Sequence, residues 1–491
     1  MRIAVFSSQI LWTPQFATDL EIIQEHINNG DEITHLYCDE TLPSCDANPY
    51  MTYDACKRCM RKRQDGYDAL DGKIIARPFL QLTEEDKKRI AELPKKFNSI
   101  QELQGLYIDD FDIGFAAGSS IISNTLNPTP DMNHELVYSY LIGAAAVYFS
   151  IKNYLASNKT DLVYIFNARF THLKAAFMAC VHSGAECYTH ERGRDIHHYV
   201  TFHNSFLHNA DTFQKSIYEH WQNADPIVAE EIASAIYRKK REGKMSLYNF
   251  TEGQKEILPN SWDPAKKNIG IFNSSENEFA SIGKEWKSHL YSSQVEGLMR
   301  LREDVKDWKD YNFYLRIHPN LKGVDNEQIR MLNNLDKGNF HVIPADSTTG
   351  SYELLLASDK IITFGSTMGI EAAFWNKPSI LAGKSLYRGM GATYEPETHE
   401  EIIELLKKDL PPLSRMAAIQ YGYYIATNGQ PFKFYEADTP HEGRFNKILL
   451  ANHLSLDEKI INKILTTHFP FSPTEHFHSW KKQKRIEKFL P

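Results

Sequence analysis

Long apolar runs are missing from this chain, although 42% of its 491 residues are hydrophobic. The best candidate, Leu141–Phe149, has about half of the roughly 18–20 residues that a helix needs to cross a bilayer. The chain begins with a strand-like segment, Met1–Phe6, and not with the charged and apolar regions of a secretion signal. We therefore expect a cytoplasmic protein. The basic and aromatic segment Trp480–Arg485 fits either an anionic membrane face or the solvated side of a final helix.

A concentration of positive charge is missing as well. Lysine and arginine number 55 against 63 aspartate and glutamate residues, the net charge is −8, and the basic residues form no long stripe. Nucleic acid is therefore not an expected partner, whereas a small anionic ligand is compatible with this balance. The chain has no Walker loop and no GxGxxG fingerprint, which argues against an ATPase or a dinucleotide oxidoreductase, and we expect no organic cofactor.

Apolar, strand-like segments alternate with helical patterns along most of the chain, which predicts parallel sheets and an α/β fold. At 491 residues the chain is too long for one ordinary core. We therefore expect two Rossmann-like, doubly wound domains. The expected parts are a first domain with a cysteine-bearing loop and a helical insertion at 1–245, a linker at 246–265, a second domain at 266–455 and C-terminal helices at 456–491.

Two segments of the second half carry the main functional signal, LRIHPN at 315–320 and GSTMGIEAA at 365–373. Each closes or follows an apolar, β-prone run, so we expect its polar residues at the carboxyl edge of a sheet, where open α/β sheets bind ligands. Each segment alone is more often a plain turn or helix cap, but two of them at successive βα units favour a functional interpretation.

The residue types in these segments indicate a phosphate and a ribose. Arg316 and His318 are candidates for phosphate contacts. Ser366 and Thr367 are predicted at the start of a helix, where free N–H groups and the helix dipole favour an anion. Glu371 lies about one helical turn later and is predicted to reach ribose hydroxyl groups.

The two segments resemble the nucleotide-sugar elements of glycosyltransferases of the GT-B architecture, in particular bacterial enzymes of surface and capsular polysaccharide assembly, including the Kdo transferases. The segment that begins Phe272-Asn273-Ser274-Ser275 and includes Glu278 is similar to the first loop of the same domain. The resemblance implies two domains that face each other across a cleft, with C-terminal helices crossing back to the first. It also implies that Ser274 and Glu278 contact the nucleotide sugar.

We therefore expect a glycosyltransferase that moves a sugar from a nucleotide-sugar donor, CMP- or UDP-linked, to a surface polysaccharide or glycoprotein acceptor. We also expect peripheral association with the inner membrane or with the polysaccharide assembly machinery. Three alternatives stay open. They are a CDP-glycerol-type polyol-phosphate transferase, a non-hydrolysing sugar-nucleotide 2-epimerase, and a glycan- or nucleotide-binding scaffold without catalysis.

Candidates for the chemical step lie in the first half. An inverting transfer requires a base that takes the proton of the acceptor hydroxyl. Glu191, at the predicted end of a strand, is the first candidate, with His190 in reserve. Arg169, after the predicted strand at 162–167, is similar to an acceptor-side feature of the same enzymes and is the third expected catalytic residue. A Glu191 that only pairs with a neighbouring arginine fits the sequence equally well, and a retaining mechanism needs no such base.

Four of the six cysteines fall within 22 residues, Cys38, Cys45, Cys56 and Cys59. In a cytoplasmic chain such a cluster can complete a four-thiolate zinc site that orders a polar loop. The spacing is irregular, so three interpretations stay open: structural zinc, unliganded or redox-active thiols, and an iron–sulfur cluster.

Overall fold

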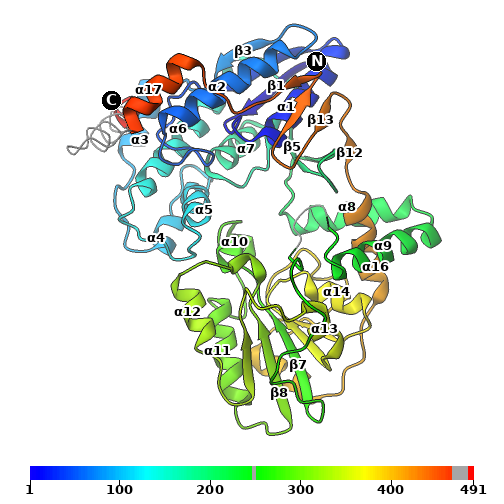
Figure 1. Cartoon of the computed structure of the whole chain (residues 1–491). Helices are drawn as coiled ribbons and strands as arrows, with labels where there is room; N and C mark the ends of the chain where they lie inside the picture. Colours follow the sequence, from blue (N-terminus) through cyan, green and yellow to red (C-terminus); the bar gives the residue numbers. More distant parts are fainter. Residues whose placement is uncertain (246–249, 467–484) are drawn as a thin grey trace. The chain divides into compact units, whose positions relative to one another are not determined.

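Residues 1–245, 250–466 and 485–491 are described in this computed structural model. The chain folds into two compact units, of which the first comprises Met1–Leu207 with Gly429–Pro491 and the second comprises His208–Asn428. Each unit contains a sheet with helices packed on it (Figure 1). The predicted α/β class with two Rossmann-like parts is confirmed.

The sheet of the first unit has the strand order β12-β6-β5-β4-β1-β2-β3. Strands β1 to β5 pair in parallel, whereas β6 and β12 are antiparallel additions at one edge. Strand β1 lies between β4 and β2 and is almost wholly buried, as its apolar sequence requires. The strands are β1 (Arg2–Ser7), β2 (Glu32–Tyr37), β3 (Ile75–Pro78), β4 (Leu162–Phe166), β5 (Cys187–Arg192), β6 (His198–His203) and β12 (Gln430–Pro431).

Helices of the first unit alternate with these strands. The longest, α6, is apolar around most of its circumference, and it is therefore buried between its neighbours α5 and α7. The helices are α1 (Thr13–Asn28), α2 (Tyr53–Asp68), α3 (Glu84–Ala91), α4 (Ile100–Gln104), α5 (Ile113–Thr125), α6 (Leu136–Ser157), α7 (Thr171–Ser183) and α17 (Leu456–Thr466).

The sheet of the second unit is entirely parallel, in the order β11-β10-β7-β8-β9. Because the chain starts in the middle and moves to one edge before it reaches the other, this is the strand order of a Rossmann sheet. Aliphatic residues of the strands, α11 and α15 form its core. The strands are β7 (Lys267–Phe272), β8 (Tyr311–Arg316), β9 (Phe340–Ile343), β10 (Lys360–Thr363) and β11 (Ser379–Leu381).

The second unit also contains short helices between its strands and longer ones at its ends. None of the helices in the described ranges is both long and apolar enough to span a membrane. The helices are α8 (Ala210–Gln222), α9 (Pro226–Arg241), α10 (Glu276–Ala280), α11 (Gln294–Val305), α12 (Glu327–Asn333), α13 (Ser351–Ala357), α14 (Met368–Phe374), α15 (His399–Lys407) and α16 (Arg415–Thr427), with 3-10 turns at Lys284–Trp286 and Pro319–Leu321.

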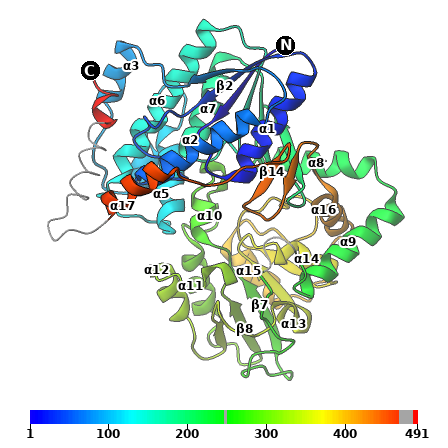
Figure 2. The ribbon, with the colours of Figure 1, turned by 45° about the horizontal axis from the view of Figure 1, so that its top comes forward.

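The last part of the chain returns to the first unit. A small sheet of β13 (Tyr435–Ala437), β14 (Gly443–Phe445) and β15 (Ile448–Leu449) packs on α1, where the buried carboxylate of Glu21 accepts the backbone N–H groups of residues 433–435. Helix α17 lies beside α2 (Figure 2). The predicted return of C-terminal helices is thus confirmed for α17. The basic segment at 480–485 lies outside the described residues except for Arg485, which is buried.

The two units have other boundaries than the sequence suggested. The first domain was expected to reach residue 245, but α8 and α9 belong to the second unit. Both pack on α16, and the hydroxyl of the buried Tyr237 on α9 donates to the carbonyl of Ala418 (2.6 Å). Most charged residues after Tyr237 are exposed, which gives this stretch the composition of a linker, but Lys240 points inward to Glu371. Residues 250–265 likewise belong to the second unit, and 429–455 to the first.

Candidate functional site

The strand ends of the second sheet bring the predicted nucleotide-binding segments together. Strand β7 lies between β8 and β10, so the loops after these three parallel strands leave the same edge of the sheet. Between β7 and β10 the chain order reverses, and this is where open α/β sheets bind ligands. Ser274 follows β7, His318 follows β8, and Gly365–Thr367 follow β10.

Side chains after β7 and β8 are joined by hydrogen bonds. Asn273 Oδ1 accepts the N–H of His318 (3.0 Å), and Ser275 Oγ donates to Asn320 Oδ1 (2.8 Å). Asn320 Nδ2 donates in turn to Glu278 Oε1 (3.0 Å), and its Oδ1 contacts His318 Nδ1 (2.5 Å). The predicted residues Glu278 and His318 therefore share a partner, Asn320, that the sequence did not single out. The signal in the sequence that could have found Asn320 was an amide residue close to the end of a buried strand.

A second network ties the loop after β7 to the start of α11. The N–H of Ser274 donates to Gln294 Oε1 (2.9 Å), and the N–H of Gln294 donates to Glu276 Oε1 (2.9 Å). Burial raises the pKa of Glu276 to about 7. The loop thus contains a carboxyl group that changes its charge near neutral pH, and no sequence pattern singles it out.

The two residues expected to supply positive charge are both affected by burial. Burial lowers the pKa of His318 to about 4, so its imidazole is neutral at pH 7. The guanidinium of Arg316 donates to the carbonyl groups of Pro344 and Ser347 (3.0 Å for the latter), and only 2% of Arg316 is exposed. Burial lowers its pKa to about 10, which leaves it charged at neutral pH. Arg316 therefore holds the loop after β9, and its predicted phosphate contact stays a prediction.

Glu371 is also turned toward the protein. Its Oε1 accepts hydrogen bonds from Lys240 Nζ (2.9 Å) and Thr367 Oγ1 (3.0 Å), and its Oε2 accepts the hydroxyl of Tyr352. The residue is 2% exposed. Nearby, Ser366 is buried and its Oγ accepts the N–H of Met368 (3.3 Å), whereas Thr367 is exposed. The carboxylate thus fastens α14 to α9 and α13, and the ribose contact of Glu371 stays a prediction.

In the first unit the chain order reverses between β1 and β4. After β4, Asn167 and Ala168 both have left-handed φ angles, 58° and 57°. This conformation costs roughly 1–2 kcal/mol for each L-residue. Asn167 holds it, because its Oδ1 accepts the N–H of Arg169 (3.0 Å) and its Nδ2 donates to Glu191 Oε2 (2.5 Å). Strained turns of this kind cluster at functional sites.

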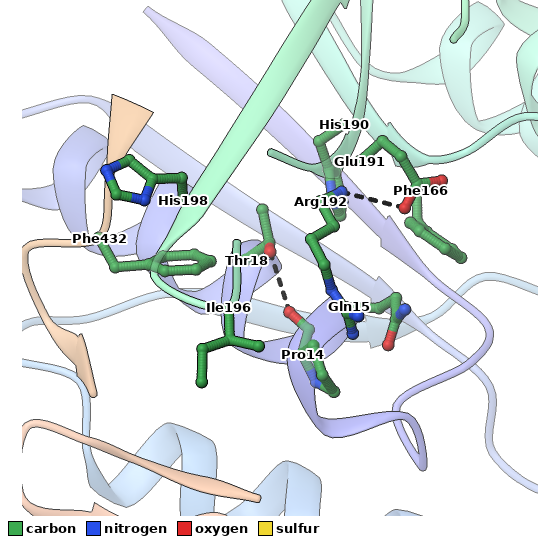
Figure 3. Close-up of a pocket in the computed structure, with 10 residues that line it drawn as sticks. All are labelled: Pro14, Gln15, Thr18, Phe166, His190, Glu191, Arg192, Ile196, His198 and Phe432. Carbon is green, nitrogen blue, oxygen red and sulfur yellow. Dashed lines mark hydrogen bonds between the residues drawn. The ribbon is translucent and has the colours of Figure 1, made fainter. Parts of the chain in front are cut away.

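A pocket lies beside this turn (Figure 3). Its lining combines two aromatic rings, two imidazoles, a carboxylate and a guanidinium, which suits a polar ligand with apolar faces. Two predicted catalytic residues, Glu191 and His190, are brought together in it. The lining residues are Pro14, Gln15, Thr18, Phe166, His190, Glu191, Arg192, Ile196, His198 and Phe432.

Arg169, the third predicted catalytic residue, is not among the residues that line this pocket. Its guanidinium lies over the Phe170 ring (4.4 Å from the ring centroid), and its Nη2 donates to Ser123 Oγ (3.4 Å). Its charge also acts on Asp46, whose pKa burial raises to about 6. Gln9 Nε2 donates to the same carboxyl (3.0 Å). Arg169 and Asp46 thus form a separate polar cluster at the β1 and β4 ends.

The clustered cysteines share one cavity but not a metal site. Among the residues that the structure describes, no group of three or more Cys, His, Asp and Glu side chains is placed to hold a metal ion, so the zinc site, one of the three interpretations, is not formed in this arrangement. The thiols face protein partners instead: Cys45 Sγ donates to the carbonyl of Ser8 (3.6 Å), and Cys56 Sγ accepts Asn48 Nδ2 (3.3 Å). Burial raises the pKa of all four thiols, which keeps them protonated. The cavity is lined by Cys38, Cys45, Cys56 and Cys59 with Met51 and Met60.

Residues 298–424, within the second unit, match the family model described as capsule polysaccharide biosynthesis protein. This unit is similar to capsule polysaccharide biosynthesis proteins. The matched segment includes both functional segments, 315–320 and 365–373, whereas Ser274 and Glu278 precede it. The predicted resemblance to enzymes of capsular polysaccharide assembly is therefore confirmed. The chain matches no curated protein sequence.

Solved structures show weaker likenesses. The β-Kdo 2,4-transferase KpsC of Thermosulfurimonas dismutans is 14% identical, with a TM-score of 0.37 over 54% of this chain and 79% of that chain. The glycosyltransferase SnogD of Streptomyces nogalater is 15% identical, with a TM-score of 0.24 over 86% of this chain and 95% of that chain. The UDP-GlcNAc 2-epimerase of Neisseria meningitidis is 12% identical, with a TM-score of 0.29 over 95% of this chain and 99% of that chain.

Proposed function

We propose that this protein is a glycosyltransferase that moves a sugar from a nucleotide-sugar donor, CMP- or UDP-linked, to a surface polysaccharide or glycoprotein acceptor. One observation carries the proposal: the segment that matches capsule polysaccharide biosynthesis proteins contains polar loops at the point where the second sheet reverses its chain order. The donor binds at these loops, and the acceptor binds in the pocket of Glu191 and His190.

Exposure divides the predicted donor residues into two groups. Glu278 and Thr367 are exposed and His318 is partly exposed, so these three are the proposed contacts of the nucleotide sugar. The other four are buried and bonded within the protein, and we assign them to shaping the loops. They are Ser274, Arg316, Ser366 and Glu371.

Nucleotide binding is the first test. A ligand that binds only the folded protein adds about 2.7 kcal/mol at 100 times its dissociation constant, which raises the melting temperature of a unit of this size by about 5–10 °C. Among CMP, CDP, UDP, GDP and ADP, we expect CMP, CDP or UDP to give such a shift. His318→Ala should remove most of it. His341→Ala, near the amino end of β9 and thus away from the loops at the carboxyl ends of the strands, is the matched control. The donor assignment fails if no nucleotide shifts the protein, or if His318→Ala keeps the full shift.

We also propose that the protein works in the cytoplasm and touches the inner membrane through α17. Leu456, Ile460 and Ile464 recur every fourth residue on this helix and are 79%, 61% and 64% exposed. Lys459 and Lys463 lie beside this stripe, as in helices that rest on a membrane surface.

Vesicle sedimentation tests this contact. Vesicles with about a third anionic lipid should carry the protein into the pellet at low salt, because burial of the apolar side chains and the charge of the lysines both favour binding. Ile460→Ser with Ile464→Ser should abolish sedimentation. Ile227→Ser removes an equally exposed apolar residue (82%) from α9 and should leave it unchanged. Equal loss in both variants, or no sedimentation of the unaltered protein, would contradict the proposal.

A further inference from the structure

Buried hydrogen bonds connect five side chains of the first unit, from α2 to the pocket of Figure 3. Tyr67 Oη lies 2.6 Å from His35 Nδ1, and His35 Nε2 lies 2.8 Å from Ser7 Oγ. Ser7 Oγ donates to Asp19 Oδ2 (2.6 Å), and Asp19 Oδ1 lies 2.7 Å from His190 Nε2. Ser7, Asp19, His35 and His190 are each at most 3% exposed. This series of hydrogen bonds therefore ends at His190, which lines the pocket.

Asp19 accepts hydrogen bonds on both carboxylate oxygens and thereby decides which atom of this hydrogen-bonded series holds each proton. An ionised carboxylate has no proton to donate, so Asp19 accepts the hydrogen bond of the Ser7 hydroxyl. Because that hydroxyl has only one proton, it must accept a hydrogen bond from His35 Nε2–H. Burial lowers the pKa of His35 to about 3, so this imidazole is neutral and its Nδ1 accepts from the Tyr67 hydroxyl. All these donors point toward Asp19, and hydrogen bonds aligned in this way strengthen one another.

The same logic fixes the tautomer of His190. Its Nε2 faces a carboxylate oxygen at 2.7 Å and must carry a proton. In a neutral imidazole the other nitrogen then holds the lone pair, so Nδ1 is the basic atom. Glu191 is engaged differently, because it accepts from Asn167 Nδ2 and from the N–H of Arg192 and thereby holds the left-handed turn.

We propose that Nδ1 of His190 takes the proton of the acceptor hydroxyl, and that Asp19, Ser7, His35 and Tyr67 are positioning residues that fix its tautomer. This assignment rests on the proposed function, on inversion at the anomeric carbon and on binding of the acceptor in this pocket. The acceptor oxygen forms its bond to the anomeric carbon while the bond from that carbon to the nucleotide phosphate breaks. The leaving nucleotide keeps the electron pair, the proton passes to His190, and Asp19 stabilises the imidazolium.

The kinetics of variants test the roles of His190 and Asp19. His190→Gln and Asp19→Asn should each lower kcat by about 10²–10⁴ with the KM for the donor unchanged, because general-base catalysis is lost while donor binding is kept. Tyr67→Phe removes one distant hydrogen bond and should lower kcat by about 2–10-fold. His203→Gln alters an exposed histidine of β6 and should have no effect. An Asp19→Asn variant that is folded and retains full kcat overturns the proposal.

Nitrogen NMR of histidine side chains gives a readout that does not depend on turnover. Protein labelled with ¹⁵N-histidine should show His190 protonated at Nε2, and Asp19→Asn should change that signal, because an amide can also donate. A proton on Nδ1 of His190 in the unaltered protein overturns the inference, whether or not the protein transfers a sugar. If every donor fails to react, the proposed function fails, while the spectrum still decides the tautomer. If Asp19→Asn does not fold, Ser7→Ala replaces it, and an unchanged His190 signal together with full kcat overturns the relay.

Discussion

Replacing Glu371 by alanine should destabilise the second unit by about 3 kcal/mol, because it leaves Lys240 without the carboxylate that pairs with it. The side chains of Glu371 and Lys240 are only 3% and 22% exposed, so water replaces little of the lost interaction. The hydroxyl groups of Thr367 and Tyr352 lose their acceptor in the same change, which adds to the cost. Urea unfolding followed by circular dichroism measures the difference in free energy.

Two further variants make this prediction specific. Glu404→Ala breaks the pair with Lys408 at the end of α15, whose side chains are more than 60% exposed, and it should change the free energy of unfolding by less than about 0.5 kcal/mol. The double variant Glu371→Leu with Lys240→Met should recover much of the loss, because both charges leave together. If Glu371→Ala instead keeps full stability and loses nucleotide affinity, the ribose contact predicted from the sequence is right and the structural role is wrong.

The sequence predicts elements well where local patterns decide them. Strand β2 coincides with a short run that contains β-branched residues, and helix α7 ends where Gly184 adopts a left-handed φ of 65°. Domain boundaries depend on contacts between distant residues instead. Tyr237 on α9 bonds to Ala418, 181 residues away, and nothing in the local pattern of α9 reveals this.

The candidate sites divide in the same way. Alternating strands and helices place polar residues at the carboxyl ends of strands, so the sequence predicts the positions of His318 and Thr367, whereas Ser274 was implied by the family resemblance. Whether such a side chain faces a ligand or the protein depends on partners far along the chain. Arg316 meets carbonyl groups of the next loop, and Asp19 meets His190 across 171 residues. Only a folded chain brings such groups together, which is why the sequence suggested His190 but not the aspartate behind it.

Gly365→Ala should weaken nucleotide binding more than tenfold and destabilise the second unit by more than about 2 kcal/mol. Gly365 has a left-handed φ of 95°, which costs an L-residue about 1–2 kcal/mol. An added Cβ would also lie 2.6 Å from the carbonyl oxygen of Lys384 and from the Phe279 ring, so the turn between β10 and α14 must move. That movement displaces Thr367, one of the proposed nucleotide contacts.

The matched control is Gly389→Ala, in the same unit. Gly389 has a similar φ of 86°, but an added Cβ would meet nothing within 4 Å. The control therefore measures the cost of backbone strain alone, and we expect it to lower stability by about 1–2 kcal/mol while nucleotide affinity is kept. Calorimetric titration with the nucleotide that stabilises the unaltered protein separates the two effects. Equal affinity in both variants would place the nucleotide away from the turn after β10. A loss confined to Gly365→Ala would tie binding to the close approach of the Lys384 carbonyl and the Phe279 ring to this turn, where the sheet reverses its order.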